Sequence, residues 1–181
     1  MNIRQPLLGI LLCAFVHGAA NAQRPGADYD IVVEGRVLDE TTGDPIKGAV
    51  VIVRKDGHSE NMVVVKGDGQ YAFELERGGR YEITYSAAGM VAKRVEVNTH
   101  GAPANLDVPR LSMNVDINLF PPVSGLATAL FEKPMGRAAY SSKVRNMRWD
   151  EEYGKAMRES IRVFMTKYDA QLEKQGTLAG R

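Results

Sequence analysis

The sequence predicts an all-β protein: a seven-stranded antiparallel β-sandwich, followed by an irregular segment and one C-terminal amphipathic α-helix. Three observations predict this fold. Apolar and polar residues alternate between residues 30 and 120, turn-forming residues interrupt the alternation at short intervals, and after residue 150 apolar residues recur at steps of three and four. Alternation places successive side chains on opposite faces of a sheet, whereas steps of three and four place them on one face of a helix.

The first 22 residues have the pattern of a secretory signal peptide. Arg4 precedes an apolar run from Leu7 to Val16, and small residues follow up to Ala22, after which we expect cleavage. A membrane-spanning helix needs roughly 20 apolar residues, about twice the length of this run. The sequence therefore predicts an exported protein with a removed leader and no transmembrane segment.

The composition of the mature chain, expected to start at Gln23, limits the classes of protein it fits. Cys13 is the only cysteine and lies in the leader, where the preceding Leu12 does not favour lipid attachment, so no disulfide is expected to stabilise the fold. Without Arg4, 22 basic residues balance 22 acidic ones. This balance does not favour binding to nucleic acid.

Seven strands are expected, at residues 31–39, 49–54, 61–66, 70–76, 80–86, 91–98 and 113–120. The clearest alternation is in "QYAFELE", "RYEITYS" and "MNVDINLF", which predicts strands with one buried and one exposed face. The intervening segments "TTGDP", "KDGHSE", "KGDGQ", "ERGG", "AAGM" and "THGAPAN" contain Gly, Asp, Asn or Pro, the residues that favour turns. Short strands at this spacing predict a sandwich that spans residues 23–120.

After residue 120 the pattern changes. Pro121 and Pro122 cannot continue a central strand, and the segment that follows is basic and is expected to be irregular. A helix is expected to start after Asp150, which favours a cap, with Glu151 and Glu152 in its first turn. Residues 121–181 are thus expected to form a linker, a basic irregular segment and a C-terminal helix.

The helix carries an apolar stripe with three interpretations. It packs on the protein's own sandwich, it binds another protein, or it lies on a membrane surface, which the acidic Glu159, Asp169 and Glu173 disfavour. Trp149, at the entrance of the helix, is also expected to anchor the helix start. As partner-binding candidates from this stripe we take Trp149, Tyr153, Met157, Ile161, Phe164 and Tyr168.

The basic stretch before the helix is a second candidate for partner binding. It is either a solvated face or a surface for an anionic partner. Its candidate residues are Lys133, Arg137, Lys143, Arg145 and Arg148.

No catalytic motif, metal ligand set or cofactor motif is recognised. His58 and His100 lie in predicted turns. Asp39, Glu40 and Asp44 flank the first turn and are interpreted as a solvated acidic turn, with a calcium site as the alternative. The sequence therefore predicts no catalytic residue, no metal and no cofactor.

The stretch from Val33 to Val97 resembles the carboxypeptidase regulatory-like domain family, and the resemblance covers about half of the chain. The motifs are G-x-V-x-D-x-x-T-G-x-P-x-x-G-A-x-V from Gly35, D-G-Q-Y-x-F from Asp68 and Y-x-I-x-Y-x-A-x-G-M from Tyr81. The resemblance implies a transthyretin-like seven-stranded sandwich that acts as an accessory module of exported bacterial proteins. It does not imply peptidase activity. The segment from Phe120 to Lys174 is similar to the tails of small secreted proteins of Gram-negative envelopes.

The sequence and these resemblances predict an exported, non-enzymatic structural or adaptor module in the periplasm or on the cell surface of a Gram-negative bacterium. We expect it to bind other envelope proteins through the helix, the basic stretch or an open sheet edge. The alternative is a module that binds carbohydrate or peptidoglycan fragments, which the small number of exposed aromatic residues disfavours. Peripheral association with the outer membrane is a further expectation.

Overall fold

The protein is described from a computed structural model, in which residues 31–103 and 110–179 are described, without the side chains of 177–179. The predicted signal peptide, residues 1–22, lies outside the described residues. Within the described ranges, no helix has the length and apolar character that would let it cross a membrane.

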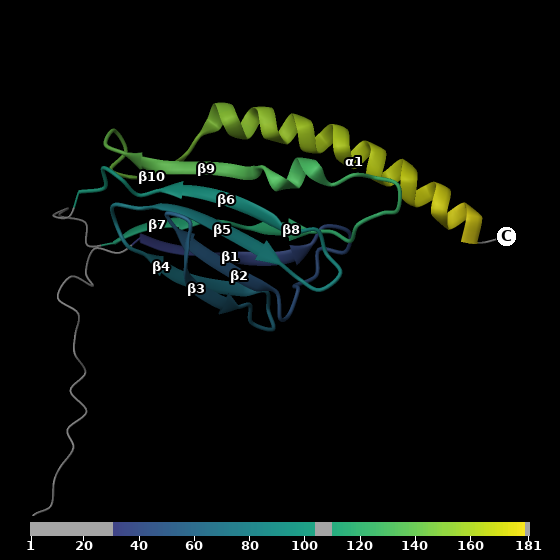
Figure 1. Cartoon of the computed structure of the whole chain (residues 1–181), viewed down its shortest axis with the longest axis horizontal. Coiled ribbons are helices and arrows are strands. Elements are labelled where there is room, and N and C mark those ends of the chain that lie inside the picture. Colours follow the sequence, from purple (N-terminus) through teal and green to yellow (C-terminus); the bar gives the residue numbers. More distant parts are fainter. Residues whose placement is uncertain (1–30, 104–109, 180–181) are drawn as a thin grey trace, which may run out of the picture.

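Two β-sheets and a long C-terminal helix make up the fold, which confirms the predicted β-sandwich with a helix (Figure 1). The smaller sheet has β1 at its centre, paired with β4 on one side and with β7 and β8 on the other, and the larger sheet has the order β10-β9-β6-β5-β2-β3. The elements are β1 (Ile31–Asp39), β2 (Val50–Lys55), β3 (His58–Val64), β4 (Gln70–Leu75), β5 (Arg80–Ser86), β6 (Lys93–Asn98), β7 (Leu111–Asn114), β8 (Ile117–Leu119), the 3₁₀ turn η2 (Ala129–Glu132), β9 (Pro134–Ser141), β10 (Asn146–Trp149) and α1 (Glu151–Ala179).

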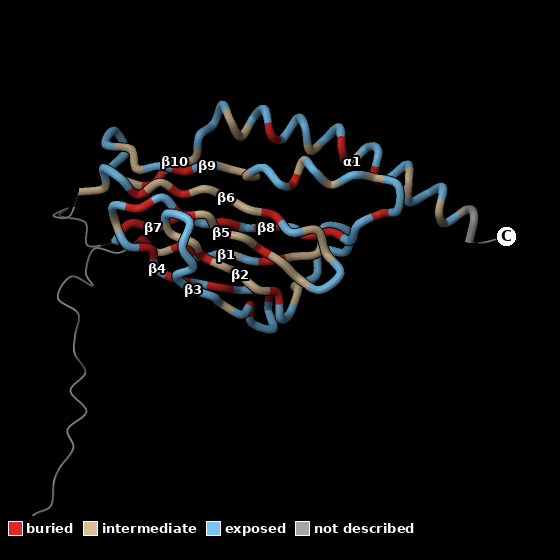
Figure 2. Tube along the Cα trace, in the orientation of Figure 1, coloured by how far each residue is buried: buried red, intermediate tan, exposed pale blue. Residues whose placement is uncertain are grey.

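The core lies between the two sheets, as the alternation predicts. In β4, Tyr71, Phe73 and Leu75 are buried and the residues between them are exposed. In Figure 2, buried and less buried positions alternate along most strands. The buried residues of the two sheets form one core cluster. Strand β3 is the exception, because none of its residues is buried.

Three strand pairs are parallel, so the prediction of a purely antiparallel sandwich is wrong for them. β7 and β8 both pair with β1 in parallel, and β9 pairs with β6 in parallel. The expected single strand at 113–120 is two strands, because the chain crosses over Gly35 between them. There Val115 N donates to Glu34 O over 2.8 Å, and Arg36 N donates to Asp116 Oδ1 over 2.9 Å.

The segment after residue 120 is not irregular, contrary to the prediction. Strands β9 and β10 form a hairpin that extends the larger sheet beyond β6. The sheet therefore continues past residue 120, where the sequence predicts a domain boundary. Glycine and alanines in "PMGRAAYS" weaken the apolar alternation that would have indicated a strand.

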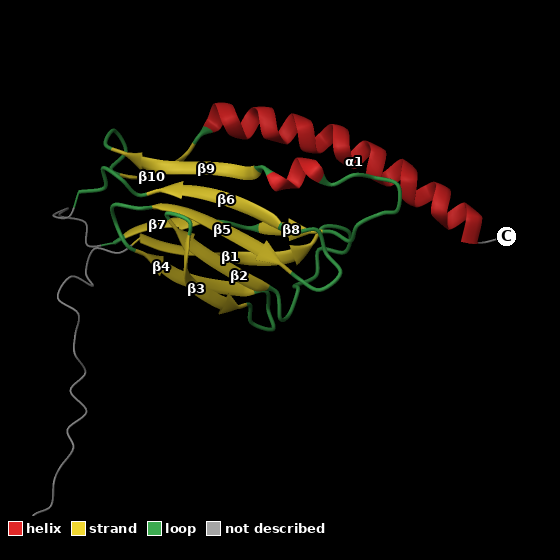
Figure 3. Cartoon of the chain, in the orientation of Figure 1, coloured by secondary structure: helices red, strands yellow, loops and turns green. Residues whose placement is uncertain are grey.

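Helix α1 runs alongside β9 and extends past the sheets toward its C-terminal end (Figure 3). Asp150 Oδ1 accepts a hydrogen bond of 2.9 Å from Tyr153 N, which confirms the predicted cap. An aromatic cluster, formed by Phe120, Phe131, Phe164 and Tyr168, joins the helix to η2 and to the end of β8. Two of its ring pairs that meet edge to face are Phe131 with Phe164, with centroids 4.8 Å apart, and Phe120 with Tyr168, with centroids 5.1 Å apart.

Lys93 is buried beneath the aromatic cluster. Its Nζ lies 5.0 Å from the ring centroid of Phe120 and 5.4 Å from that of Phe131, and 3.7 Å from Glu40 Oε2. Burial lowers the pKa of Lys93, and the nearby Glu40 opposes this shift. The ammonium group is thus held by two ring faces and one carboxylate, which compensate part of its lost hydration.

Two buried tyrosines predict a loss of stability at alkaline pH. Tyr71 donates a hydrogen bond to Val115 O over 2.5 Å, and its hydroxyl lies 2.9 Å from that of Tyr85. Burial raises the pKa of both phenols above the ordinary value of 10.0. The unfolded chain releases these protons near pH 10 and the folded chain retains them, so the free energy of unfolding should fall as the pH rises above about 10.

Urea unfolding between pH 7 and 11 tests this expectation, with Tyr85→Phe as the comparison. The variant should lose less stability above pH 10 than the natural protein. Lys93 is unchanged in both proteins, so the difference between the two curves reports the tyrosine. If the free energy of unfolding fell equally steeply with pH in both proteins, Tyr85 would ionise alike in the folded and the unfolded state.

Candidate functional site

The apolar stripe of the helix packs on this chain, which is the first of the three interpretations that the sequence leaves open. Met157, Phe164 and Tyr168 are 6%, 8% and 2% exposed, and Ile161 is half-buried against the same cluster. Tyr168 OH donates a 3.0 Å hydrogen bond to Pro121 O. These side chains are not accessible to a partner in this structure.

The two remaining residues of the predicted stripe anchor the helix start. Tyr153 OH donates to Pro134 O over 2.7 Å, and its ring centroid lies 4.2 Å from Cζ of Arg137. Trp149 packs against the core, with its ring over Gly136, where a Cβ atom would come within 2.8 Å of the ring. Both are half-buried and connect the helix to β9.

The structure divides the predicted basic stretch among three places. Lys133 follows η2, and Lys143 and Arg145 lie in the turn between β9 and β10. Arg137 and Arg148 project from β9 and β10 on the outer face of the larger sheet, the face turned away from the core. Only these two residues of the stretch share one surface.

Most of the outer face is a ladder of paired charges across neighbouring strands. Arg94 and Arg54 lie 3.0 Å and 3.6 Å from the carboxylate of Glu82, and Arg137 lies 3.1 Å from that of Glu96. All five side chains are about one-third or more exposed, so each pair contributes little to stability. Each charged group of the ladder thus has a partner of opposite charge within the ladder. The two ends of the face carry different kinds of side chain.

An aliphatic patch lies at the β3 end of this face. Val50 pairs with Val64 and Ile52 with Met62, so four aliphatic side chains lie together on the two outermost strands. Met62 is 65% and Val64 60% exposed, although polar residues are expected on the exposed face of a strand. β3 pairs only with β2 in the described part of the chain, so the patch lies beside an open sheet edge.

An arginine hollow of about 490 Å³ lies at the opposite end of the face. Its side chains come from four strands and the residue after β10: Arg80, Glu96, Asn98, Arg137, Ala139, Ser141, Arg148 and Asp150. It thus contains Arg137 and Arg148 of the basic stretch, together with Arg80, which lies 57 positions before Arg137 in the sequence. Sequence reasoning missed Arg80, because only the strand register places it in a row with the hairpin.

The acidic turn and His100 have structural partners. Asp39 Oδ1 accepts hydrogen bonds from Thr41 N and Thr42 N over 2.8 and 3.1 Å, which explains the turn that follows β1. His100 Nδ1 lies 2.9 Å from Asn98 Oδ1, and His58 is the exposed first residue of β3. Among the described residues, no three His, Cys, Asp or Glu side chains are grouped as a metal site requires.

Comparison with solved structures gives weak similarities over half of the chain. They include a Bacteroides fragilis protein of unknown function (18% identity, TM-score 0.35, 51% of this chain and 28% of that one). A Klebsiella pneumoniae 5-hydroxyisourate hydrolase matches with 17% identity and a TM-score of 0.36, over 50% of this chain and 90% of that one. The Bacillus anthracis TIE protein matches with 12% identity and a TM-score of 0.42, over 51% of this chain and 17% of that one. The chain spans less than two thirds of the first and third of these, and at such TM-scores none supports a conclusion about activity.

Comparison with protein families gives a more specific result. No curated protein matches the chain. The model of the carboxypeptidase regulatory-like domain matches residues 32–111, from β1 to the first residue of β7. This range includes all three motifs on which the resemblance in the sequence rests. Residues 32–111 therefore form a carboxypeptidase regulatory-like domain.

Proposed function

We propose that this protein is an exported, non-enzymatic adaptor module of the cell envelope, and that it binds an extended segment of another envelope protein along β3. The observation that carries the proposal is the aliphatic patch beside an open edge. An exposed apolar patch next to unpaired backbone groups is the combination that β-strand addition uses. The regulatory-like domain, an accessory and not a catalytic module, supports the same assignment.

The edge of β3 offers two kinds of contact to such a segment. In the described part of the chain no strand pairs with its outward N–H and C=O groups, so they can hydrogen-bond an added strand. Met62 N donates to Asn61 Oδ1 over 2.8 Å, and an added strand would have to replace this bond. Met62 and Val64 are two residues apart and lie on one face, which matches the spacing of side chains along an extended chain. The expected partner segment therefore has aliphatic residues at alternate positions.

The size of the patch favours a strand of another protein over a second copy of this chain. A stable interface buries about 800 Å² on each partner, and four aliphatic side chains offer well below this area. An added strand needs less side-chain area, because main-chain hydrogen bonds supply part of its affinity. The four patch residues are uncharged, so the contacts that they offer are apolar.

Capture from crosslinked envelopes tests the proposal. Tagged protein should retain a defined envelope protein, and the double variant Met62→Ser, Val64→Ser should lose most of it. Val144→Ser is the matched control, because Val144 is 50% exposed but lies in the β9–β10 turn, far along the sheet from the patch. It should capture the same protein as the unchanged chain, and crosslinked peptides should include residues of β3.

Two results would contradict the proposal. Equal capture by the patch variant and the control would show that the partner binds elsewhere. A dimer in sedimentation that dissociates on Met62→Ser, Val64→Ser would instead identify a second copy of this chain as the occupant of the edge.

A further inference from the structure

We propose that the arginine hollow binds an acidic saccharide, a uronic acid or a chain end that carries one. This site is at the other end of the sheet from the aliphatic patch and is independent of the protein–protein contact proposed above. Four observations carry it: the row of residues that forms the hollow, the guanidinium of Arg80, which is unpaired among the described residues, the fixed backbone beneath that residue, and the mixture of donors and acceptors around the floor.

The hollow exists because short side chains stand between long ones. Register places Arg80, Asn98, Ala139 and Arg148 in one row across β5, β6, β9 and β10. Neighbouring strands are about 4.8 Å apart, so the two arginines stand roughly 14 Å from each other. The short Asn98 and Ala139 between them leave a floor, which Ser141 extends along β9.

Arg80 has no partner for its guanidinium group among the described residues: the contacts recorded for it there come from its backbone. The other two arginines of the hollow are paired, Arg137 with Glu96 and Arg148 with Glu151. A carboxylate that enters the hollow therefore meets one cation that forms no ion pair with another described residue. Arginine suits this role because its planar fork binds a carboxylate through two parallel hydrogen bonds.

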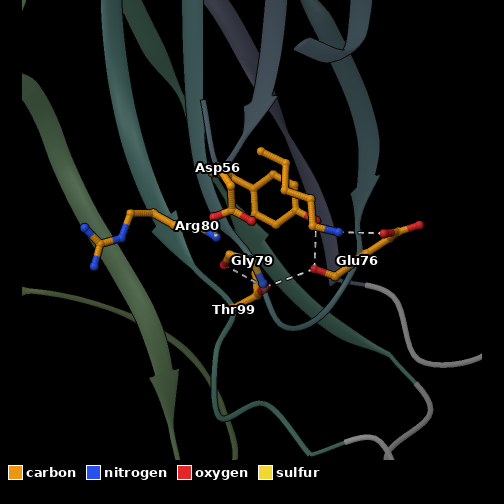
Figure 4. Close-up of polar contacts among 7 residues, drawn as sticks. Asp56, Glu76, Gly79, Arg80 and Thr99 are labelled. Carbon is orange, nitrogen blue, oxygen red and sulfur yellow. Dashed lines mark hydrogen bonds and ion pairs between the residues drawn. The ribbon is translucent and has the colours of Figure 1, made fainter. Parts of the chain in front are cut away.

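The backbone at Arg80 is held in place from both sides (Figure 4). Arg80 N donates to Asp56 Oδ1 over 3.1 Å, and Asp56 N donates to Arg80 O over 2.8 Å. Gly79 N donates to Oγ1 of the fully buried Thr99 over 2.9 Å, and Thr99 N donates to Gly79 O over 2.9 Å. The Arg80 side chain points away from this network, so a fixed strand end presents its guanidinium group.

The remaining groups match sugar hydroxyls better than a second negative charge. Glu96 and Asp150 accept hydrogen bonds from hydroxyls and repel polyanions, whereas the Asn98 amide and the Ser141 hydroxyl both donate and accept. Since Asn98 Oδ1 already accepts from His100 N over 3.0 Å, its NH₂ group is the part that faces a ligand. One carboxylate with several hydroxyls is the chemistry of a uronic acid, and the volume is in the range of small-ligand sites.

Titration of the full mature protein with named probes tests the assignment. Glucuronic acid and a short oligogalacturonate should bind, with glucose and inorganic phosphate as the comparisons. Arg80→Gln should weaken uronate binding about tenfold or more, because it removes a hydrogen-bonded charge pair. Arg94→Gln is the matched control: it removes an equal charge from the same face, outside the hollow, and should leave affinity within about twofold.

Each outcome decides the question. If the oligogalacturonate binds more tightly than glucuronic acid, and Arg80→Gln abolishes this binding, the ligand is a polysaccharide end. If the two probes bind equally tightly, the ligand is the free sugar acid. Phosphate binding as tight as uronate, equal loss in both variants, or no uronate binding at millimolar concentration would overturn the proposal. The Met62→Ser, Val64→Ser variant should keep full uronate affinity, so failure here is distinct from failure of the strand-binding proposal.

Discussion

Replacing Gly35 by alanine should lower the free energy of unfolding by more than about 3 kcal/mol, a value in the tail of single substitutions. A Cβ atom at this position would lie 2.1 Å from Val115 O and 2.6 Å from Val115 C. Both are backbone atoms, so the crossing between β7 and β8 must shift, and the parallel pairing of β1 with these strands would weaken. Urea unfolding measures the loss.

Gly67→Ala is the matched control for this substitution. Nothing lies within 4 Å of a Cβ atom built on Gly67, and its backbone is not in the left-handed region. The variant should therefore be as stable as the natural protein or more stable by about 0.4–1 kcal/mol, because alanine restricts the unfolded chain. An equal loss from both substitutions would show that the close approach at Gly35 is not what requires glycine.

Phe164→Ala should lower the free energy of unfolding by about 3–5 kcal/mol, the usual cost of removing a buried aromatic ring. Phe164 is 8% exposed, and its ring centroid lies 4.8 Å from that of Phe131 and 5.7 Å from that of Phe120. The deletion leaves a void between the helix and η2. Amide hydrogen exchange should become faster in the C-terminal half of α1, because fewer contacts hold the helix to the sandwich.

The neighbouring residue provides the control for the helix. Val163 is 44% exposed, so Val163→Ala removes little buried surface and improves helix propensity. It should leave stability within about 0.5 kcal/mol of the natural protein. If Phe164→Ala were equally mild, the apolar stripe would not hold the helix to the sandwich, and the interpretation that it binds a partner would regain support.

The alternation of apolar residues was sufficient to predict the strands from residue 31 to residue 98, with shifts of one to three residues at their ends in most cases. β1 and β5 agree with the prediction at both ends. The ends of β3 differ by two or three residues, because the register shifts between Val53 and Arg54 and moves the pairing toward the hairpin turn. Local pattern is informative there because hairpin strands pair with sequence neighbours.

Pairing between distant segments could not be predicted in this way. β9 pairs with β6 only through a connection of 35 residues, and the parallel strands β7 and β8 are placed by the close approach at Gly35. The candidate sites have the same limit. The stripe on the helix is apolar whether it packs on this chain or on a partner, and Arg80 joins Arg148 only through the order of four strands. The exposure of Met62 follows from the place of β3 at the sheet edge, which the sequence does not state.

Hydrogen exchange of the protein, alone and with the captured envelope partner, tests the central claim most directly. The proposal predicts slower exchange of the backbone amides of β3, residues 58–64, when the partner is bound, because an added strand hydrogen-bonds the open edge. Amides of β10, at the opposite edge of the same sheet, should exchange at unchanged rates. Unchanged exchange in β3, together with protection in α1 or β10, would contradict the proposal and place the partner on the helix or at the other end of the sheet.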